Sequence, residues 1–236
     1  MDNTAVFTIS GKKNGQRIES RILEEEIQAA VADGHRRLKI EAFGQHGIGG
    51  RLWKAGDDPV SLKIDGPPGQ RTGSMGFPNT VIEVNGPASD DVGWLNAGAD
   101  ILVLGNAGNG AANAMAQGRI WVAGNIGARG MTMTKHNPRF DPPELWVLGE
   151  FMAGGTTVIC GHRPQTPDNV LGYRPLVGMV GGKVFFRGPH KGFSQVDAKL
   201  APITDAEWAW LTENLRGFLS RIGQPDLFDA LADRNQ

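Results

Sequence analysis

Residues 81–124 read VIEVNGPASDDVGWLNAGADILVLGNAGNGAANAMAQGRIWVAG, in which three apolar strands each end on a glycine. The closing glycines are Gly86, Gly105 and Gly124, and the same pattern extends upstream to Gly66. These four glycines follow one another at nearly equal spacing along the chain. A repeat of this regularity and length is typical of chains built from stacked structural units.

Three further strands downstream end on Gly149, Gly161 and Gly188, at unequal spacing. Glycine suits a corner that requires positive φ or that leaves no room for a Cβ. The pattern therefore predicts an all-β fold, a parallel β-helix (solenoid) of about 19–20 residues per turn. The longer intervals contain the loops 131–143 and 162–175, and we expect these loops to contact partners because insertions on solenoids usually project from one face.

Amphipathic segments flank the repeats. Residues 18–34 predict a helix that ends at Gly34, and residues 38–42 alternate as a half-buried strand that opens the solenoid. Thr204 and Glu207 have the spacing of a capping box ahead of a second helix. We expect that helix to pack over an open end of the solenoid, with docking of a partner as the alternative. The predicted regions are 1–58 (N-terminal helix, strand and first corner capping the solenoid), 59–190 (β-helix repeats) and 191–236 (C-terminal loop and capping helix).

The composition excludes several classes of protein. Lys and Arg number 24 against 25 Asp and Glu, so nothing favours a sequence-independent grip on nucleic acid or on an anionic membrane. Cys160 is the only cysteine, which excludes an internal disulfide framework and fits a reducing compartment. The sequence has neither a signal-peptide pattern at its N-terminus nor an apolar run long enough to span a bilayer. We therefore expect a cytoplasmic protein.

The sequence predicts no catalytic, cofactor-binding or metal-binding residues. The loops 105–110 and 124–130 are rich in glycine, as phosphate-binding loops are, but neither precedes a helix, so we interpret them as repeat corners. Cys160 lies between apolar neighbours and is expected to be an unreactive core residue. The histidines lack ligand partners at the usual spacing and the aspartates lie in separate turns. These residues are His35, His46, His136, His162 and His190, and Asp57, Asp58, Asp65, Asp90 and Asp91.

The repeats and flanking helices together resemble the GXGXG domain that closes the large subunit of glutamate synthase and also forms one of the subunits of formylmethanofuran dehydrogenase. The resemblance is carried by ILEEEIQAAVADG (22–34), residues 81–127, EFMAGGTTVICG (150–161) and GMVGGKVFFRG (178–188). It implies a right-handed parallel β-helix without catalytic residues of its own. The chain departs from the pattern between Gly149 and Gly155, where a corner is missing.

The resemblance implies a non-catalytic structural subunit of a glutamate-synthase-like complex in nitrogen metabolism. The chain would brace glutaminase-type and synthase-type subunits of an oxidoreductase, with FMN and an iron–sulfur cluster in those partners and no cofactor in this chain. The alternative is the corresponding GXGXG subunit of a formylmethanofuran-dehydrogenase-like molybdenum or tungsten complex. A free-standing β-helix enzyme acting on a carbohydrate is a third hypothesis, and the absence of clustered carboxylates in the sequence disfavours it.

Overall fold

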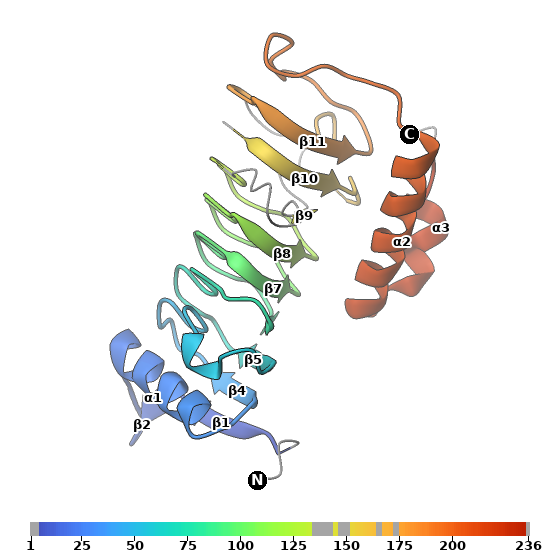
Figure 1. Cartoon of the computed structure of the whole chain (residues 1–236). Coiled ribbons are helices and arrows are strands. Elements are labelled where there is room, and N and C mark those ends of the chain that lie inside the picture. Colours follow the sequence, from blue (N-terminus) through green and yellow to red (C-terminus); the bar gives the residue numbers. More distant parts are fainter. Residues whose placement is uncertain (1–4, 134–143, 146–151, 164–166, 172–174, 235–236) are drawn as a thin grey trace.

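The computed structural model describes residues 5–133, 144–145, 152–163, 167–171 and 175–234. Its largest element is a nine-stranded sheet in which every strand is parallel to its neighbours (Figure 1). In sheet order the strands are β1 (Phe7–Ser10), β4 (Arg37–Glu41), β5 (Val60–Asp65), β6 (Thr80–Asn85), β7 (Ala97–Val103), β8 (Gln117–Val122), β9 (Glu144–Leu145), β10 (Ala153–Ile159) and β11 (Gly181–Phe186).

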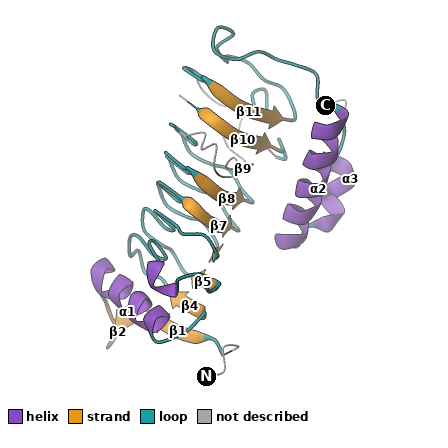
Figure 2. Ribbon diagram, viewed as in Figure 1, coloured by secondary structure: helices purple, strands orange, loops and turns teal. Residues whose placement is uncertain are grey.

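The remaining elements are short strands and helices near the two termini of the chain (Figure 2). A two-stranded antiparallel hairpin and the helix α1 lie near the N-terminus, and α2 and α3 lie near the C-terminus. Their bounds are β2 (Lys12–Lys13), β3 (Gln16–Arg17), α1 (Ser20–Ala32), α2 (Asp205–Arg221) and α3 (Phe228–Leu231), with 3-10 turns at Trp53–Ala55 and Pro225–Leu227. Within the described residues, no helix combines the length and the apolar character that crossing a membrane requires.

The strand register confirms the spacing of the closing glycines. Val60 pairs with Thr80, Val81 with Asp100, and Asp100 with Arg119, so each partner is offset by the same interval as the successive glycines from Gly66 to Gly124. Further along, Arg119 pairs with Glu144, Glu144 with Thr156, and Thr156 with Lys183, and these offsets match the unequal intervals up to Gly188. The interval between Gly149 and Gly161 is short, yet the strand β9 before it pairs with both β8 and β10 in the sheet.

The predicted all-β class, a right-handed parallel β-helix, is wrong. The described residues form a mixed α/β structure, and no closed solenoid is found among them. The sequence missed β1, which pairs in parallel with β4, so α1 becomes the crossover that such a pair requires. Leu23 and Ile27 of α1 are fully buried in the same core as Ile40 of β4. The helix at 18–34 and the strand at 38–42 are confirmed within a few residues, but β4 is the second strand of the sheet, not the first.

A second ladder of backbone hydrogen bonds joins the loops that precede the strands. The N–H of Asp91 donates to the carbonyl of Asn109 at 2.7 Å. The N–H of Leu95 donates to the carbonyl of Asn113 at 2.9 Å. Positive φ recurs at every second residue of these loops, in the series 71, 73, 75; 91, 93, 95; 110, 112, 114; and 129, 131, 133. The middle residue faces the core, where a Cβ added to Gly93 would lie 2.1 Å from Cδ1 of Ile120.

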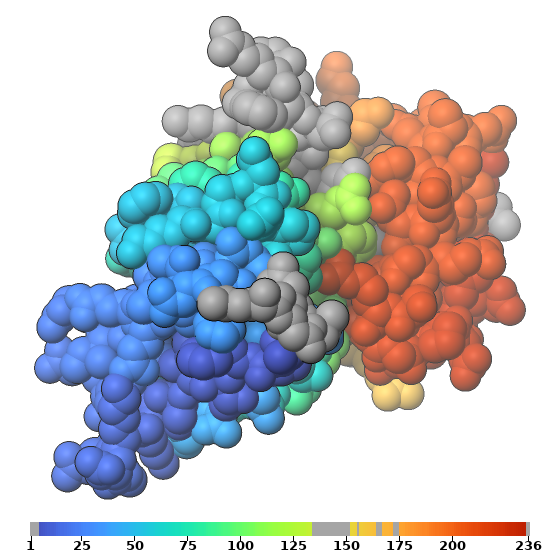
Figure 3. Space-filling view, turned by 60° about the horizontal axis from the view of Figure 1, so that its bottom comes forward, coloured from blue at the N-terminus to red at the C-terminus, as the bar shows by residue number. Residues whose placement is uncertain are grey.

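The C-terminal helix lies along one face of the sheet. Leu215, Phe218 and Leu219 of α2 form a buried cluster with Leu102 of β7 and Trp121 of β8. This cluster is separate from the main core on the other side of the sheet. We call the side covered by α2 the outer face. The predicted helix and its capping box are confirmed, but its packing differs from the expected cap over an open end (Figures 1 and 3).

Candidate functional site

The glycine-rich corners use their backbone donors within the stack. Asn109 N donates to Asp90 Oδ1 at 2.8 Å, and one repeat later Ala128 N donates to Asn109 Oδ1 at 2.8 Å. A parallel pair links Asn125 N to Asn106 Oδ1 at 2.9 Å. These side chains accept the N–H groups that a phosphate would need. The interpretation of the two loops as repeat corners is therefore supported.

The same contacts explain why the corners contain glycine. A Cβ at Gly124 would lie 2.2 Å from Asn106 Oδ1, and one at Gly127 would lie 2.5 Å from Asn109 Oδ1. Real Cβ atoms do not come this close to other atoms, so the asparagine ladder excludes any side chain at these two positions.

The histidines make separate structural contacts. His35 stacks on Phe7 with ring centroids 4.1 Å apart, and His190 lies edge-on to Phe186 at 4.6 Å. His46 Nδ1 accepts a hydrogen bond from Gln70 N at 2.9 Å. His162 is exposed, and His136 lies outside the described residues. In the part of the chain that the structure describes, no three His, Cys, Asp or Glu side chains are grouped to hold a metal ion.

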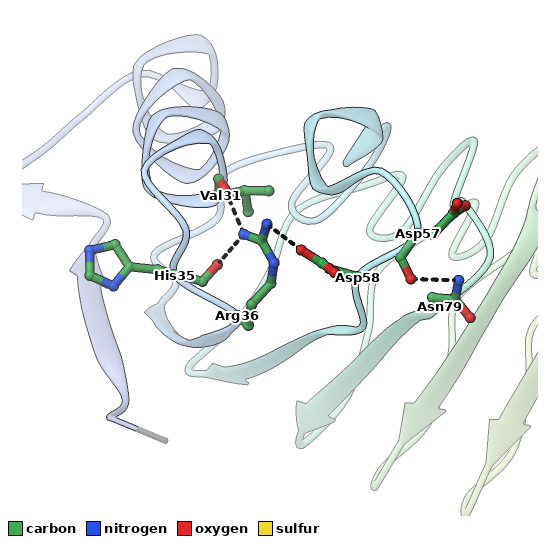
Figure 4. Close-up of polar contacts among 6 residues, drawn as sticks. All are labelled: Val31, His35, Arg36, Asp57, Asp58 and Asn79. Carbon is green, nitrogen blue, oxygen red and sulfur yellow. Dashed lines mark hydrogen bonds and ion pairs between the residues drawn. The ribbon is translucent and has the colours of Figure 1, made fainter. Parts of the chain in front are cut away.

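The adjacent aspartates Asp57 and Asp58 do not form a catalytic pair, because their carboxylates point in different directions (Figure 4). Asp58 forms an ion pair with Arg36 at 3.0 Å, and Arg36 also donates to the carbonyl of Val31 at 2.7 Å. The backbone carbonyl of Asp57 accepts from Asn79 Nδ2 at 3.1 Å. These contacts tie the end of α1 to the loops before β5 and β6, which is a structural role.

Asp65, Asp90 and Asp91 are also occupied by structural contacts. Asp65 pairs with Lys39 at 3.1 Å, and the hydrogen bond from Asn85 and the Lys39 contacts lower the pKa of its carboxyl. Asp90 caps the corner of the next repeat, and Asp91 lies 3.8 Å from the guanidinium of Arg71. The five aspartates thus occupy three separate places, namely the loop before β5, the end of β5 and the loop before β7.

Glu24 is an ionisable group that the sequence analysis missed. Burial raises its pKa to about 7, although the charge of Arg51 and a hydrogen bond from the backbone of Gly49 oppose the shift. Its Oε1 atom and that of Gln28, one helical turn further on, are buried without a hydrogen-bond partner among the described residues. No sequence signal distinguishes Glu24, because the next two residues of α1 are also glutamates, and these form ion pairs with Arg21 and Lys13.

A cavity of about 930 Å³ lies between β10, β11 and the beginning of α2. The last turns of α2 contact β7 and β8 closely, whereas Trp208 and Leu211 in its first turns are only partly buried and line the cavity. The other principal apolar residues that line it are Val158, Leu171, Phe185 and Phe193. Sequence periodicity could not reveal this cavity, because its walls come from separate elements.

Cys160 lies at the end of β10 and lines this cavity. Burial raises the pKa of its thiol to about 12, although the nearby charge of Arg187 acts in the opposite direction. The thiolate is the nucleophilic form of cysteine, and at this pKa it is scarcely populated at neutral pH. The predicted lack of reactivity is therefore supported, while the position differs, since Cys160 packs against the outer cluster beneath α2 and not in the main core.

Comparison with known proteins finds no match, either to a protein-family model, to a curated protein or to a solved structure. The resemblance to GXGXG domains accordingly stays a prediction from the sequence.

Proposed function

We propose that this chain is a non-catalytic structural subunit of a glutamate-synthase-like complex, in which it braces glutaminase-type and FMN/iron–sulfur synthase-type subunits. The proposal rests on the sequence resemblance and on one structural observation. The backbone N–H groups of the glycine-rich corners donate hydrogen bonds to side chains of the neighbouring repeat, as the ladder from Asp90 through Asn109 to Ala128 illustrates. In this proposal the repeats maintain a shape, the partner subunits carry the cofactors, and the complex is cytoplasmic.

Exposed apolar side chains at equivalent corner positions support contact with other proteins. Leu95 is 38% exposed and Met133 is 52% exposed, and the hydrogen bonds from Leu95 to Asn113 and from Ala114 to Thr132 place them two repeats apart in one column. We call these two residues the corner ridge. Apolar side chains grouped at a surface favour interaction with a protein partner.

The corner ridge leads into one of the predicted partner-binding loops. Met133 belongs to the loop 131–143, of which residues 134–143 lie outside the described part, as do residues 164–166 and 172–174 of the loop 162–175. We propose that both loops contact the partner subunits. The positive φ of Met131 and Met133 continues the backbone pattern of the regular repeats into the first of them.

Affinity purification of the tagged chain from its source cells, followed by mass spectrometry and metal analysis, tests the proposal. The expected result is co-purification with a glutaminase-type subunit and a flavoprotein, with FMN and iron in the complex. Purification without either subunit would overturn the proposal. Molybdenum or tungsten in the complex would instead favour the alternative, a formylmethanofuran-dehydrogenase-like assembly.

A matched pair of variants tests the corner ridge separately. The double substitution Leu95→Glu and Met133→Glu is expected to reduce recovery of the partners, because each carboxylate would be desolvated at the interface. Val81→Glu on β6 is the control, since Val81 is 40% exposed but lies on the outer face. Equal recovery with all variants, at unchanged thermal stability, would exclude the ridge as a contact surface.

A further inference from the structure

The cavity beneath α2 differs from an ordinary packing defect in its size and in its lining. A volume of about 930 Å³ lies at the upper end of the range for small-molecule sites, which is roughly 300–1,000 Å³. Phe185, Phe193 and Trp208 supply aromatic surface, and Leu211 adds aliphatic surface from α2. A lining of this kind favours a hydrocarbon or aromatic group over a polar molecule.

One cationic side chain in the cavity has an unused donor. Arg187 Nε is buried and has no hydrogen-bond partner among the described residues. A buried donor of a charged group that lacks a partner is costly, and an anionic oxygen is its strongest complement. Arg187 directly follows β11, and its backbone N–H donates to the carbonyl of Ile159 at the end of β10 at 3.0 Å, so this residue lies beside the sheet that forms one wall of the cavity.

The other charged residues that line the cavity already have partners or face solvent. Lys183 binds Glu207 at 2.5 Å, and Asp197 accepts from the backbone N–H of Gly178 at 3.0 Å. Arg234 pairs at 2.7 Å with Asp205, a residue that does not line the cavity. Lys199 is exposed to solvent, and Asp233 has an interaction of its own. Among these groups Arg187 alone combines burial with an unsatisfied donor, so it is the group that an acidic ligand would complement.

We propose that the cavity between α2 and the β10–β11 part of the sheet binds an amphipathic carboxylate, with its hydrocarbon part against Phe185, Trp208 and Leu211 and its carboxylate on Arg187. The site binds and does not catalyse, since no covalent step is required of Cys160. Occupation would fill the space between the first turns of α2 and the sheet. The ligand would therefore hold the C-terminal segment more firmly on the outer face.

Calorimetric titration of the full-length chain with decanoate and with decanol tests the proposal. Both probes present similar hydrocarbon surface, but only decanoate carries a charge that Arg187 can bind. We expect decanoate to bind about tenfold more tightly or better, as a charge-assisted hydrogen bond implies. Equal affinities for the two probes, or no binding of decanoate, would overturn the proposal.

Three variants and a control assign the effect to the residues named. Arg187→Met should remove the preference for decanoate while leaving decanol binding, whereas Arg187→Lys should retain part of the preference. Arg234→Met is the matched control, because Arg234 is already paired and should not affect the preference. Leu211→Trp should fill the cavity and weaken both probes. A decanoate preference that survives Arg187→Met in a chain with unchanged circular dichroism would contradict the assignment.

Discussion

The two halves of the sheet bury helices on opposite faces. At the N-terminal end, α1 contributes Leu23, Ile27 and Val31 to the main core, and the outer face of β4–β6 is left uncovered by any described helix. At the C-terminal end, α2 packs on the outer face of β7 and β8 through a second buried cluster. One continuous sheet thus has α1 on one side of its N-terminal half and α2, with the short α3, on the other side of its C-terminal half.

The strand register shows where the outer face changes character. Lys39, Lys63 and Glu83 occupy one row across β4, β5 and β6. The same row continues with Leu102 and Trp121 on β7 and β8. Further along the sheet, Val158 pairs with Phe185 on β10 and β11. The strand geometry is the same in both halves, so the change from charged to apolar side chains explains why α2 packs on the C-terminal half.

The largest expected effect is on the covered half. Trp121 is 5% exposed, stacks on Phe218 with ring centroids 5.5 Å apart and donates from Nε1 to Asp100 at 3.0 Å. Trp121→Ala should lower the free energy of unfolding by about 3–5 kcal/mol, because it leaves a cavity beneath α2. Urea denaturation monitored by circular dichroism measures this loss. Val81→Ala on the uncovered half is the control, with an expected change of at most about 0.5 kcal/mol. Similar losses for both variants would contradict the comparison.

The second prediction concerns Glu24 on α1, whose folded-state pKa of about 7 lies above its ordinary value of 4.5. The fold disfavours the ionised carboxylate, so stability decreases as the pH rises from about 4.5 to 7 and then stays level. Glu24→Gln should therefore raise the free energy of unfolding at pH 8 by about 1–3 kcal/mol and flatten its pH dependence.

Glu25→Gln is the control for this measurement, because Glu25 is exposed and pairs with Arg21 on the surface of α1. Urea denaturation of the three proteins between pH 4 and pH 8 separates the effects. A Glu24→Gln variant with the same pH profile as the unmodified chain would contradict the burial of this carboxylate.

The third prediction concerns the start of α2, where Thr204 and Glu207 form the capping box. Hydrogen bonds from Lys183 and Thr204 lower the pKa of Glu207 to about 2, so its contribution to stability is complete above about pH 4.5 and is lost as the pH falls through 2. Thr204→Ala should cost about 1 kcal/mol. Thr212→Ala, within the same helix, should be close to neutral. Thermal unfolding at pH 7 compares the two, and an equal effect of both would exclude a specific capping contribution.

The smallest effect is expected on the uncovered outer face. Lys63 pairs with Glu83 at 3.2 Å, and the side chains are 55% and 36% exposed. A double-mutant cycle with Lys63→Ala and Glu83→Ala should give a coupling of at most about 0.5 kcal/mol, and added salt should reduce it further. A coupling of several kcal/mol would show that this face is desolvated, for example by a partner subunit.

Sequence reasoning identified the elements that depend on local pattern. The spacing of the strands follows the closing glycines at 66, 86, 105, 124, 149, 161 and 188. The offset between paired residues of neighbouring strands equals the interval between the corresponding glycines in every case. Gly34 and the pair Thr204 and Glu207 correctly marked the end of α1 and the start of α2. Each of these signals arises within a short stretch of chain, because capping and turn geometry are local.

Sequence reasoning failed where contacts join distant segments. The strand β1 is short, with Phe7 and Thr8 exposed, and only its pairing with β4 makes it part of the sheet. The positive φ of Met75 and Leu95 could not be predicted from the sequence either, because neither is a residue type that favours the left-handed region. Their conformation follows from the hydrogen bonds to the next repeat, which a single loop does not predict.

The repeat length, the glycine corners and the amphipathic helices can be read from the amino-acid sequence, because each depends on side chains close together in the chain. The tertiary structure alone decided the mixed α/β class, the separate cluster beneath α2, the raised pKa of Glu24 and the unpartnered donor of Arg187 among the described residues. Both kinds of feature depend on desolvation. A helix packs on one face of the sheet, and a charged group is desolvated, only when segments far apart in the sequence come together.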